Sequence, residues 1–124
     1  MSNTKENDTM KKRILYIDNA PMIALVIQRI LGEKYKILFA SSVQEARQIS
    51  NTQTISLVIA EPYIDEEGVL NFLNQKGGGT SILILTGSLP KLGYFYSQLR
   101  VKYTTLEKPF NTKGFIKIVE ELTS

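Results

Sequence analysis

The sequence predicts an α/β fold in which a five-stranded parallel sheet is covered by helices on both faces. Three observations lead to this prediction: short apolar runs alternate with amphipathic segments, two of the runs are almost purely aliphatic, and most end at a polar residue. Unbroken aliphatic strands are typical of parallel sheets that are buried on both faces. Parallel strands of one sheet are joined by right-handed crossover connections, which place the intervening helices on the two faces of the sheet.

Five segments are expected to form the strands, because each combines aliphatic or aromatic residues with a turn signal nearby. The predicted strands are 14–17, 35–40, 55–60, 82–85 and 101–107. The runs at 55–60 and 82–85 are the two almost continuous aliphatic ones, which favours buried positions in the sheet.

The segments between the strands carry apolar residues at helical spacing. Helices are expected around the apolar groups 23–31, 46–49, 69–73, 92–99 and 115–122. Pro21 suits the first turn of the first helix, and Ser42 with Glu45 has the spacing of a capping box before the second. The first helix is expected to turn its apolar stripe, from Ile23 to Leu31, toward the core.

The chain has 124 residues, of which 43% are hydrophobic, and this size and composition fit one domain. We expect that domain at 11–124, after a polar N-terminal extension at 1–10. The lack of cysteine and histidine excludes disulfides, thiolate or imidazole metal ligands, and the usual nucleophiles and general bases. The extension resembles neither a signal peptide nor a membrane span, so a cytoplasmic protein without a membrane partner is expected. The net charge of +3 comes from mostly scattered basic residues, so nucleic-acid binding is not expected.

Four polar residues that end or follow the apolar runs are expected to meet at one edge of the sheet. They are Asp18, Glu61, Thr86 and Lys108, and Pro109 directly follows the lysine. Ligand sites of open α/β sheets lie beyond the carboxyl ends of their strands. A fixed cation beside a hydroxyl group at that edge predicts a phosphate pocket.

The order of these motifs, together with the spacing from Thr86 to Lys108, resembles the receiver domain of two-component response regulators, a flavodoxin-like (βα)5 module, from about Lys11 to Leu122. The segments that carry the resemblance are 14–21, 57–61, 83–86 and 106–110. The resemblance implies an acidic pair that binds Mg²⁺, a phosphoaccepting aspartate, a hydroxyl residue, and a lysine followed by proline. It also implies a cis peptide bond before Pro109 and a role in a phosphorelay.

Matched to the family residue by residue, Asp18 corresponds to the first acid, Thr86 to the hydroxyl residue and Lys108 to the lysine. Two positions depart from the family pattern: Asn19 replaces the second acid, and Glu61 replaces the phosphoaccepting aspartate. Mg²⁺ prefers carboxylate, phosphate and water oxygens in octahedral geometry, so both departures weaken the implied metal site. We therefore expect no resident cofactor.

The change from aspartate to Glu61 also bears on phosphoryl transfer. Glutamate is one methylene longer, which misplaces its oxygens by about 1 Å and can lower the rate about a hundredfold. The longer side chain can instead reach toward Lys108 and Thr86. Two interpretations stay open: Glu61 partly mimics the phosphorylated aspartate, or it forms a simple ion pair with Lys108. The aromatic switch residue of the family falls on Thr105, so the usual hydroxyl–aromatic coupling is not expected at that position.

Other acidic residues also have two interpretations. Asp18 is expected in a vestigial ion pocket, and a carboxylate that caps the first helix is the alternative. Asp65, Glu66 and Glu67 follow the third strand, where a solvated charged turn is favoured over a cation site.

These features favour a receiver-like signalling module that acts by protein–protein interaction and is not an enzyme. The implied partners are a sensor kinase or a downstream effector, with a homodimer as an alternative. In the family the output surface comprises the fourth helix, the fifth strand and the fifth helix, where aromatic residues are candidate partner anchors. These are Tyr94, Phe95, Tyr96 and Tyr103, of which at least one is expected to be exposed. Two other functions stay open: phosphoryl acceptance at Glu61 or Asp65, and small-molecule binding at the strand edge.

Overall fold

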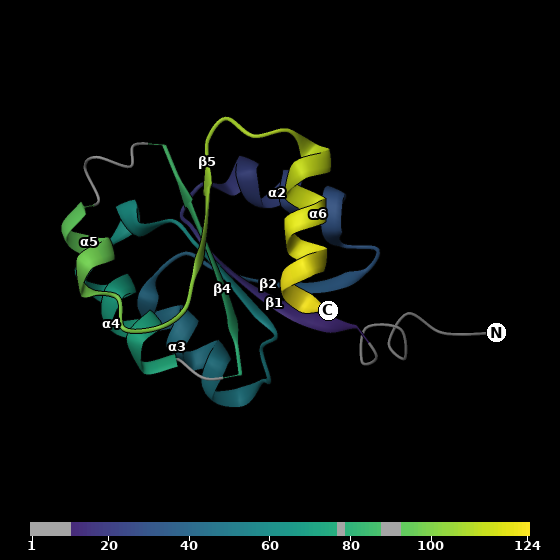
Figure 1. The fold of residues 1–124 in the computed structure, drawn as a ribbon. Coiled ribbons are helices and arrows are strands. Elements are labelled where there is room, and N and C mark those ends of the chain that lie inside the picture. Colours follow the sequence, from purple (N-terminus) through teal and green to yellow (C-terminus); the bar gives the residue numbers. More distant parts are fainter. Residues whose placement is uncertain (1–10, 77–78, 88–92) are drawn as a thin grey trace.

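The computed structural model describes residues 11–76, 79–87 and 93–124, and all structural statements concern these residues (Figure 1). They form a parallel five-stranded sheet with the strand order β2-β1-β3-β4-β5. The strands are β1 (Lys12–Ile17), β2 (Tyr35–Ala40), β3 (Leu57–Ala60), β4 (Ser81–Thr86) and β5 (Thr104–Glu107). This arrangement confirms the predicted fold class. The expected extension at 1–10 lies outside the described residues.

Helices cover the two faces of the sheet, as Figure 1 shows. One face carries α2 (Pro21–Leu31) and α6 (Thr112–Thr123), which pack beside each other. The other face carries α3 (Val43–Thr52), α4 (Glu66–Lys76) and α5 (Gly93–Gln98). A short 3-10 helix, η1 (Pro62–Ile64), joins β3 to α4. The apolar groups chosen from the sequence fall in these helices with two exceptions: Leu99 lies just past the end of α5, and Leu92 with its neighbours at 88–91 lies outside the described residues.

The central strands are buried on both faces, which explains their unbroken aliphatic sequences. In β3, Leu57 and Ile59 face α2 and α6, whereas Val58 and Ala60 face the opposite helices. All four residues are fully buried. Because side chains alternate across a strand, an apolar residue is needed at every position of a strand between two helical layers.

Two predicted strands are shorter in the structure. The third begins at Leu57 rather than 55, because Ile55 is buried but precedes the first pairing with β1. The fifth begins at Thr104 rather than 101, where its pairing with β4 starts. β5 is an edge strand with alternating exposure, so few aliphatic residues mark its limits in the sequence. The 3-10 helix was not predicted.

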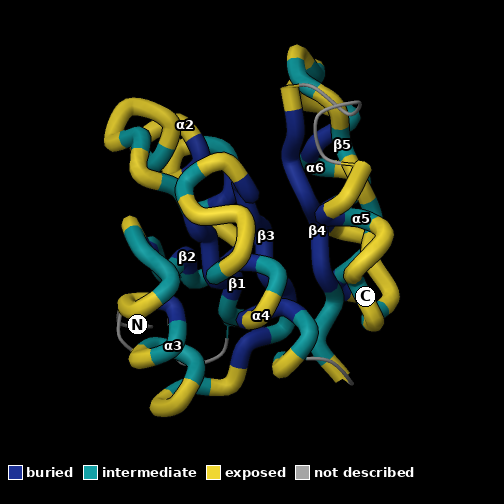
Figure 2. Tube along the Cα trace, turned by 90° about the vertical axis from the view of Figure 1, so that its left-hand side faces the viewer, coloured by how far each residue is buried: buried dark blue, intermediate teal, exposed yellow. Residues whose placement is uncertain are grey.

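Helix α2 differs from the expectation in the direction of its apolar residues. Ile27 and Leu31 are buried against the sheet, but Ile23 and Val26 are exposed. The expected core-facing stripe is therefore only partly correct. Figure 2 shows exposed turns along the outer side of α2. This helix is more apolar than its contacts with the sheet require.

The capping pattern before α3 is partly as expected. The Ser42 hydroxyl accepts a hydrogen bond from the Glu45 amide at 3.1 Å, which is the predicted N-cap contact. The Glu45 carboxylate does not return to Ser42 and instead contacts the hydroxyl group of Ser41. The start of α3 is therefore fixed by two neighbouring serines.

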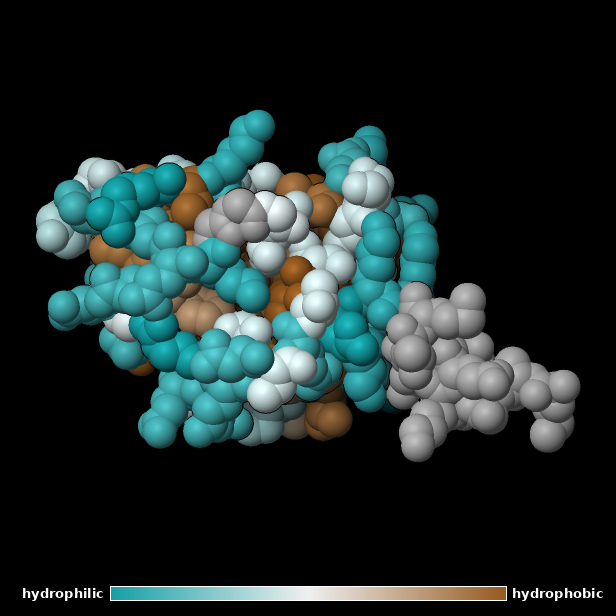
Figure 3. All heavy atoms as spheres, turned by 90° about the horizontal axis from the view of Figure 1, so that it is seen from below, coloured by the Kyte–Doolittle hydropathy of each residue, from teal (hydrophilic) through white to brown (hydrophobic). Residues whose placement is uncertain are grey.

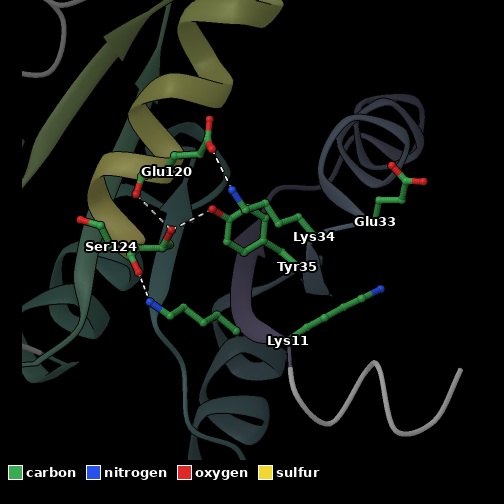
Figure 4. A pocket seen from close by; sticks show the side chains of 8 residues that line it. Lys11, Glu33, Lys34, Tyr35, Glu120 and Ser124 are labelled. Carbon is green, nitrogen blue, oxygen red and sulfur yellow. Dashed lines mark hydrogen bonds and ion pairs between the residues drawn. The ribbon is translucent and has the colours of Figure 1, made fainter. Parts of the chain in front are cut away.

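The amino edge of the sheet holds the C-terminal end of α6. There the Tyr35 and Thr123 hydroxyls lie 2.9 Å apart, Lys12 donates to the Thr123 carbonyl, and Lys34 pairs with Glu120 at 2.7 Å (Figure 4). These contacts border an open pocket of about 880 Å³. Figure 3 views the molecule from below, and hydrophilic side chains cover much of that face. The lysine contacts with α6 indicate a structural role for this region. Among the described helices, none has the length and apolarity that a membrane crossing requires.

Candidate functional site

The sheet brings the four predicted site residues to its carboxyl edge. Asp18, Glu61 and Lys108 each follow a strand directly, and Thr86 ends β4. Backbone hydrogen bonds continue the pairing between strands past their ends. The Glu61 amide donates to the Ile17 carbonyl at 3.1 Å, and the Lys108 amide donates to the Thr86 carbonyl at 2.8 Å. The backbone at the site is therefore held by the sheet itself.

Glu61 and Lys108 form an ion pair across this edge. The Lys108 ammonium contacts Oε1 of Glu61, whose residue is only 4% exposed, whereas the lysine side chain is 39% exposed. Burial raises the pKa of the Glu61 carboxyl, Lys108 opposes this rise, and the charge of Asp18 adds to it. The peptide bond between Lys108 and Pro109 is cis, as the resemblance implied.

Asp18 lies beside this pair but does not cap α2. One of its carboxylate oxygens accepts a hydrogen bond from the Asn19 amide at 2.7 Å. The N-cap position of α2 is Ala20, without a side-chain cap, so the capping alternative for Asp18 is wrong. The side chain of Tyr16 is buried near the same edge. Burial raises the pKa of Tyr16, and the charges of Asp18 and Glu61 raise it further.

The residues at this edge do not fit a Mg²⁺ ion well. Asp18 and Glu61 supply the carboxylates at this edge, and the Glu61 carboxylate is already paired with the Lys108 ammonium. Asn19 is exposed and offers a neutral amide oxygen in place of a third charge. Within the described ranges there is no cluster of three acidic residues that could hold a metal. This edge therefore offers an octahedral cation fewer charged oxygen ligands than the acidic pair and aspartate that the resemblance implies.

Thr86 has an aromatic neighbour that the sequence did not predict. Burial raises the pKa of Tyr96 on α5, Tyr103 adds to the rise, and the nearby hydroxyl of Thr86 opposes it. The Tyr96 ring stacks on Tyr103 with centroids 5.5 Å apart and an angle of 20°. Thr105, the expected switch position, is exposed on β5. An aromatic residue thus reaches the hydroxyl from a different element, and no spacing rule within β5 could reveal it.

The acidic segment after β3 stabilises the start of α4. Asp65 accepts a hydrogen bond from the Gly68 amide at 3.0 Å, and Glu66 and Glu67 lie in the first turn of the helix. Carboxylates at that end satisfy free amides and favour the helix dipole. This geometry supports the charged-turn interpretation over a cation site.

The aromatic residues expected at the output surface divide by exposure. Tyr94 is 76% exposed, Tyr103 is partly exposed and Tyr96 is half-buried. Phe95 is buried in the core, so its inclusion as an interface candidate is corrected. Neighbouring positions of a helix point in different directions, which separates Tyr94 from Phe95.

Comparisons with known proteins agree with this architecture. No family sequence model and no curated protein sequence matches the chain. Among solved structures, the chemotaxis response regulator CheY4 of Vibrio cholerae matches with a TM-score of 0.76 and 18% identity, covering 91% of this chain and 99% of that chain. The receiver domain of the hybrid histidine kinase CckA matches with a TM-score of 0.70 and 24% identity, covering 90% and 99%. A response regulator from Thermotoga maritima matches with a TM-score of 0.75 and 18% identity, covering 92% and 98%. The chain therefore has the (βα)5 fold of response regulator receiver domains.

Proposed function

We propose that this chain is a receiver-like signalling module that acts by protein–protein interaction and has lost the ability to accept a phosphoryl group. The observation that carries the proposal is the ion pair between buried Glu61 and Lys108. In the receiver fold these two positions correspond to the phosphoacceptor and to the lysine that neutralises the phosphoryl group. Here each of the two charges satisfies the other.

The chemistry of this edge argues against phosphoryl transfer. In-line attack needs a carboxylate held within a fraction of an ångström and a cation that neutralises the transferred group. Glu61 is occupied by Lys108, and the donor set around Asp18 and Asn19 suits Mg²⁺ poorly. The ion pair instead fixes the loops after β3 and β5 in one arrangement. A phosphoryl group would hold the same loops partly through its own contact with the lysine. Glutamate supplies one negative charge and two oxygens, whereas a phosphoryl group supplies about two negative charges and three oxygens, so the mimicry is partial.

The surface proposed to contact a partner lies on α5 and directly before β5. Tyr94 projects into solvent, and Tyr103 is partly exposed while its ring stacks on Tyr96. Exposed tyrosines are frequent anchors in protein interfaces. Because Tyr96 also lies near Thr86, the edge and this surface are connected through packed side chains. A sensor kinase or a downstream effector is the proposed partner class.

Intact-mass measurement after incubation with Mg²⁺ and acetyl phosphate tests the loss of phosphoryl acceptance. The wild type is expected to keep its mass, whereas the double variant Asn19→Asp/Glu61→Asp is expected to gain one phosphoryl group. The single variant Glu61→Asp separates the contribution of the acceptor from that of the metal ligand. A mass gain on the wild-type protein would overturn the proposal, and mapping would then assign the acceptor to Glu61 or Asp65.

Backbone amide NMR spectra test whether the ion pair presets the surface. Glu61→Gln removes one charge of the buried pair and is expected to shift amide signals in β5 and around Tyr94. Glu120→Gln is the matched control, because it removes the same charge from the exposed pair with Lys34. Shifts confined to the immediate neighbours of Glu61 would contradict a preset output surface.

A further inference from the structure

Helix α2 presents an apolar stripe to solvent that the fold does not use. Met22 is 72% exposed and Leu25 is 66% exposed, and Val26 on the same face is also exposed. Positions 22, 25, 26 and 29 are spaced by three and four residues and so form one continuous row on a helix. Arg29 is exposed and is the charged residue of the helix.

An exposed apolar row of this kind is unusual on the outer face of a surface helix. A surface helix normally carries charged or polar residues on its outer face, whereas α2 is apolar on both sides. Contiguous apolar patches on soluble proteins mark interaction sites. Figure 2 shows the outer turns of α2 as exposed, on the face of the sheet opposite to α5.

The charges at the two ends of the row are complementary to each other. Asp18 precedes the N-terminal end of α2, and Arg29 lies in its last turn. Arg29 takes part in neither of the ion pairs described above, Lys34–Glu120 and Lys108–Glu61. A surface with an acid at one end, an apolar centre and a base at the other end can pair with a copy of itself in antiparallel orientation.

We propose that α2 is the contact helix of a symmetric dimer, with a second copy of this chain as its occupant. The two-fold axis passes between Leu25 and Val26, so that these residues of the two copies pack on each other. Arg29 and Met22 each lie about 5 Å along the helix from that point, since the rise is 1.5 Å per residue. Arg29 of one copy therefore lies over the first turn of the other helix, within reach of Asp18.

This arrangement has a consequence for the carboxyl edge of the sheet. Asp18 is one of the two carboxylates there, and its charge raises the pKa of the Glu61 carboxyl. An arginine from the second copy would neutralise part of that charge. The dimer is expected to be weak, with a dissociation constant on the order of 0.1 mM, because one helix face is smaller than the roughly 800 Å² per partner of standard interfaces.

Sedimentation velocity over a concentration series up to about 1 mM tests the proposal on the full chain. The wild type is expected to shift from monomer to dimer across this range. Leu25→Glu is expected to abolish the dimer, whereas Tyr63→Glu is the matched control, because it introduces the same charge at another exposed apolar residue, in η1. Circular dichroism verifies that both variants are folded.

A charge exchange tests the antiparallel geometry. Arg29→Asp and Asp18→Lys each place like charges opposite one another in a homodimer, and each is expected to weaken it about tenfold or more. An equimolar mixture of the two variants restores both attractive pairs, so a heterodimer with near wild-type affinity is expected.

Three results would overturn the proposal. A wild type that stays monomeric at every concentration would exclude α2 as the contact helix of a dimer. Equal dimerisation of the wild type and Leu25→Glu would place the interface elsewhere. If the mixture of Arg29→Asp and Asp18→Lys does not regain near wild-type affinity, the antiparallel arrangement is excluded. None of these outcomes depends on phosphoryl acceptance or on the α5 surface, so the proposed function is tested separately.

Discussion

Replacing Lys108 with methionine removes the partner of a buried carboxylate while keeping most of the apolar stem of the side chain. Glu61 is 4% exposed, so its charge has little access to water once the ammonium is gone. Breaking a fully buried ion pair in this way destabilises proteins by about 3–5 kcal/mol. Lys108 is 39% exposed, so water already screens the pair. We therefore expect Lys108→Met to lower the free energy of unfolding by about 2 kcal/mol at pH 7.

The expected loss depends on pH because it arises from the charge of Glu61. Below its ordinary pKa of 4.5 the carboxyl is neutral in the folded and the unfolded protein, so the effect of Lys108→Met should largely disappear. At pH 7 the loss corresponds to a fall in melting temperature of about 6–10 °C for a domain of this size. The double variant Glu61→Gln/Lys108→Met should recover much of the stability, because no buried charge remains.

Urea unfolding followed by circular dichroism at pH 7 and pH 4 measures these differences. Lys34→Met is the matched control, because it breaks the exposed pair with Glu120 at the opposite edge of the sheet. That variant is expected to have a much smaller effect. Equal losses for Lys108→Met and Lys34→Met, or a loss that is the same at both pH values, would refute the assignment of Glu61 as a buried charge held by Lys108.

Two further predictions concern single polar groups in the core. Burial raises the pKa of the Glu61 carboxyl in the folded protein, so the stabilising contribution of this group is fully present below pH 4.5 and is lost as the pH rises through the higher folded pKa. In urea titrations Glu61→Gln should therefore gain stability relative to the wild type between pH 4 and pH 7. A relative loss would mean that the attraction of Lys108 outweighs the effect of burial. The buried hydroxyl of Tyr16 has no hydrogen-bond partner among the described residues, whereas that of Tyr35 lies 2.9 Å from the Thr123 hydroxyl. Thermal unfolding should accordingly show Tyr16→Phe to be neutral or stabilising and Tyr35→Phe to be destabilising by about 1 kcal/mol, and the opposite order would contradict this hydrogen-bond assignment.

Patterns within short segments could be predicted well, because they follow from local periodicity. The aliphatic runs around Val58 and Ile84 identified the buried strands, and the polar residues that follow them were placed correctly at the carboxyl edge. The pairing of Glu61 with Lys108 was one of two interpretations from the sequence, and the geometry of the ion pair now supports it. Whether that pair also mimics a phosphorylated state stays a prediction.

Which side chains meet where the helices pack on the sheet was not predictable from the sequence. Tyr96 comes near Thr86 because α5 packs over the edge of the sheet, and a periodic pattern reports a helix face without stating which residue it meets. The exposure of Val26 has the same origin, since only the docking of α2 on the sheet decides which part of its broad apolar surface is buried.

The sequence by itself determined the alternation of strands and helices, the parallel sheet, and the set of polar residues at its carboxyl edge. Hydrophobic periodicity and residue chemistry are sufficient for these, because each is a property of a short segment. The tertiary structure decided how deeply Glu61 is buried, which aromatic ring accompanies Thr86 and which side of α2 is left in solvent. These depend on the packing of helices onto a shared sheet, where small rotations of an element change its neighbours without changing its pattern.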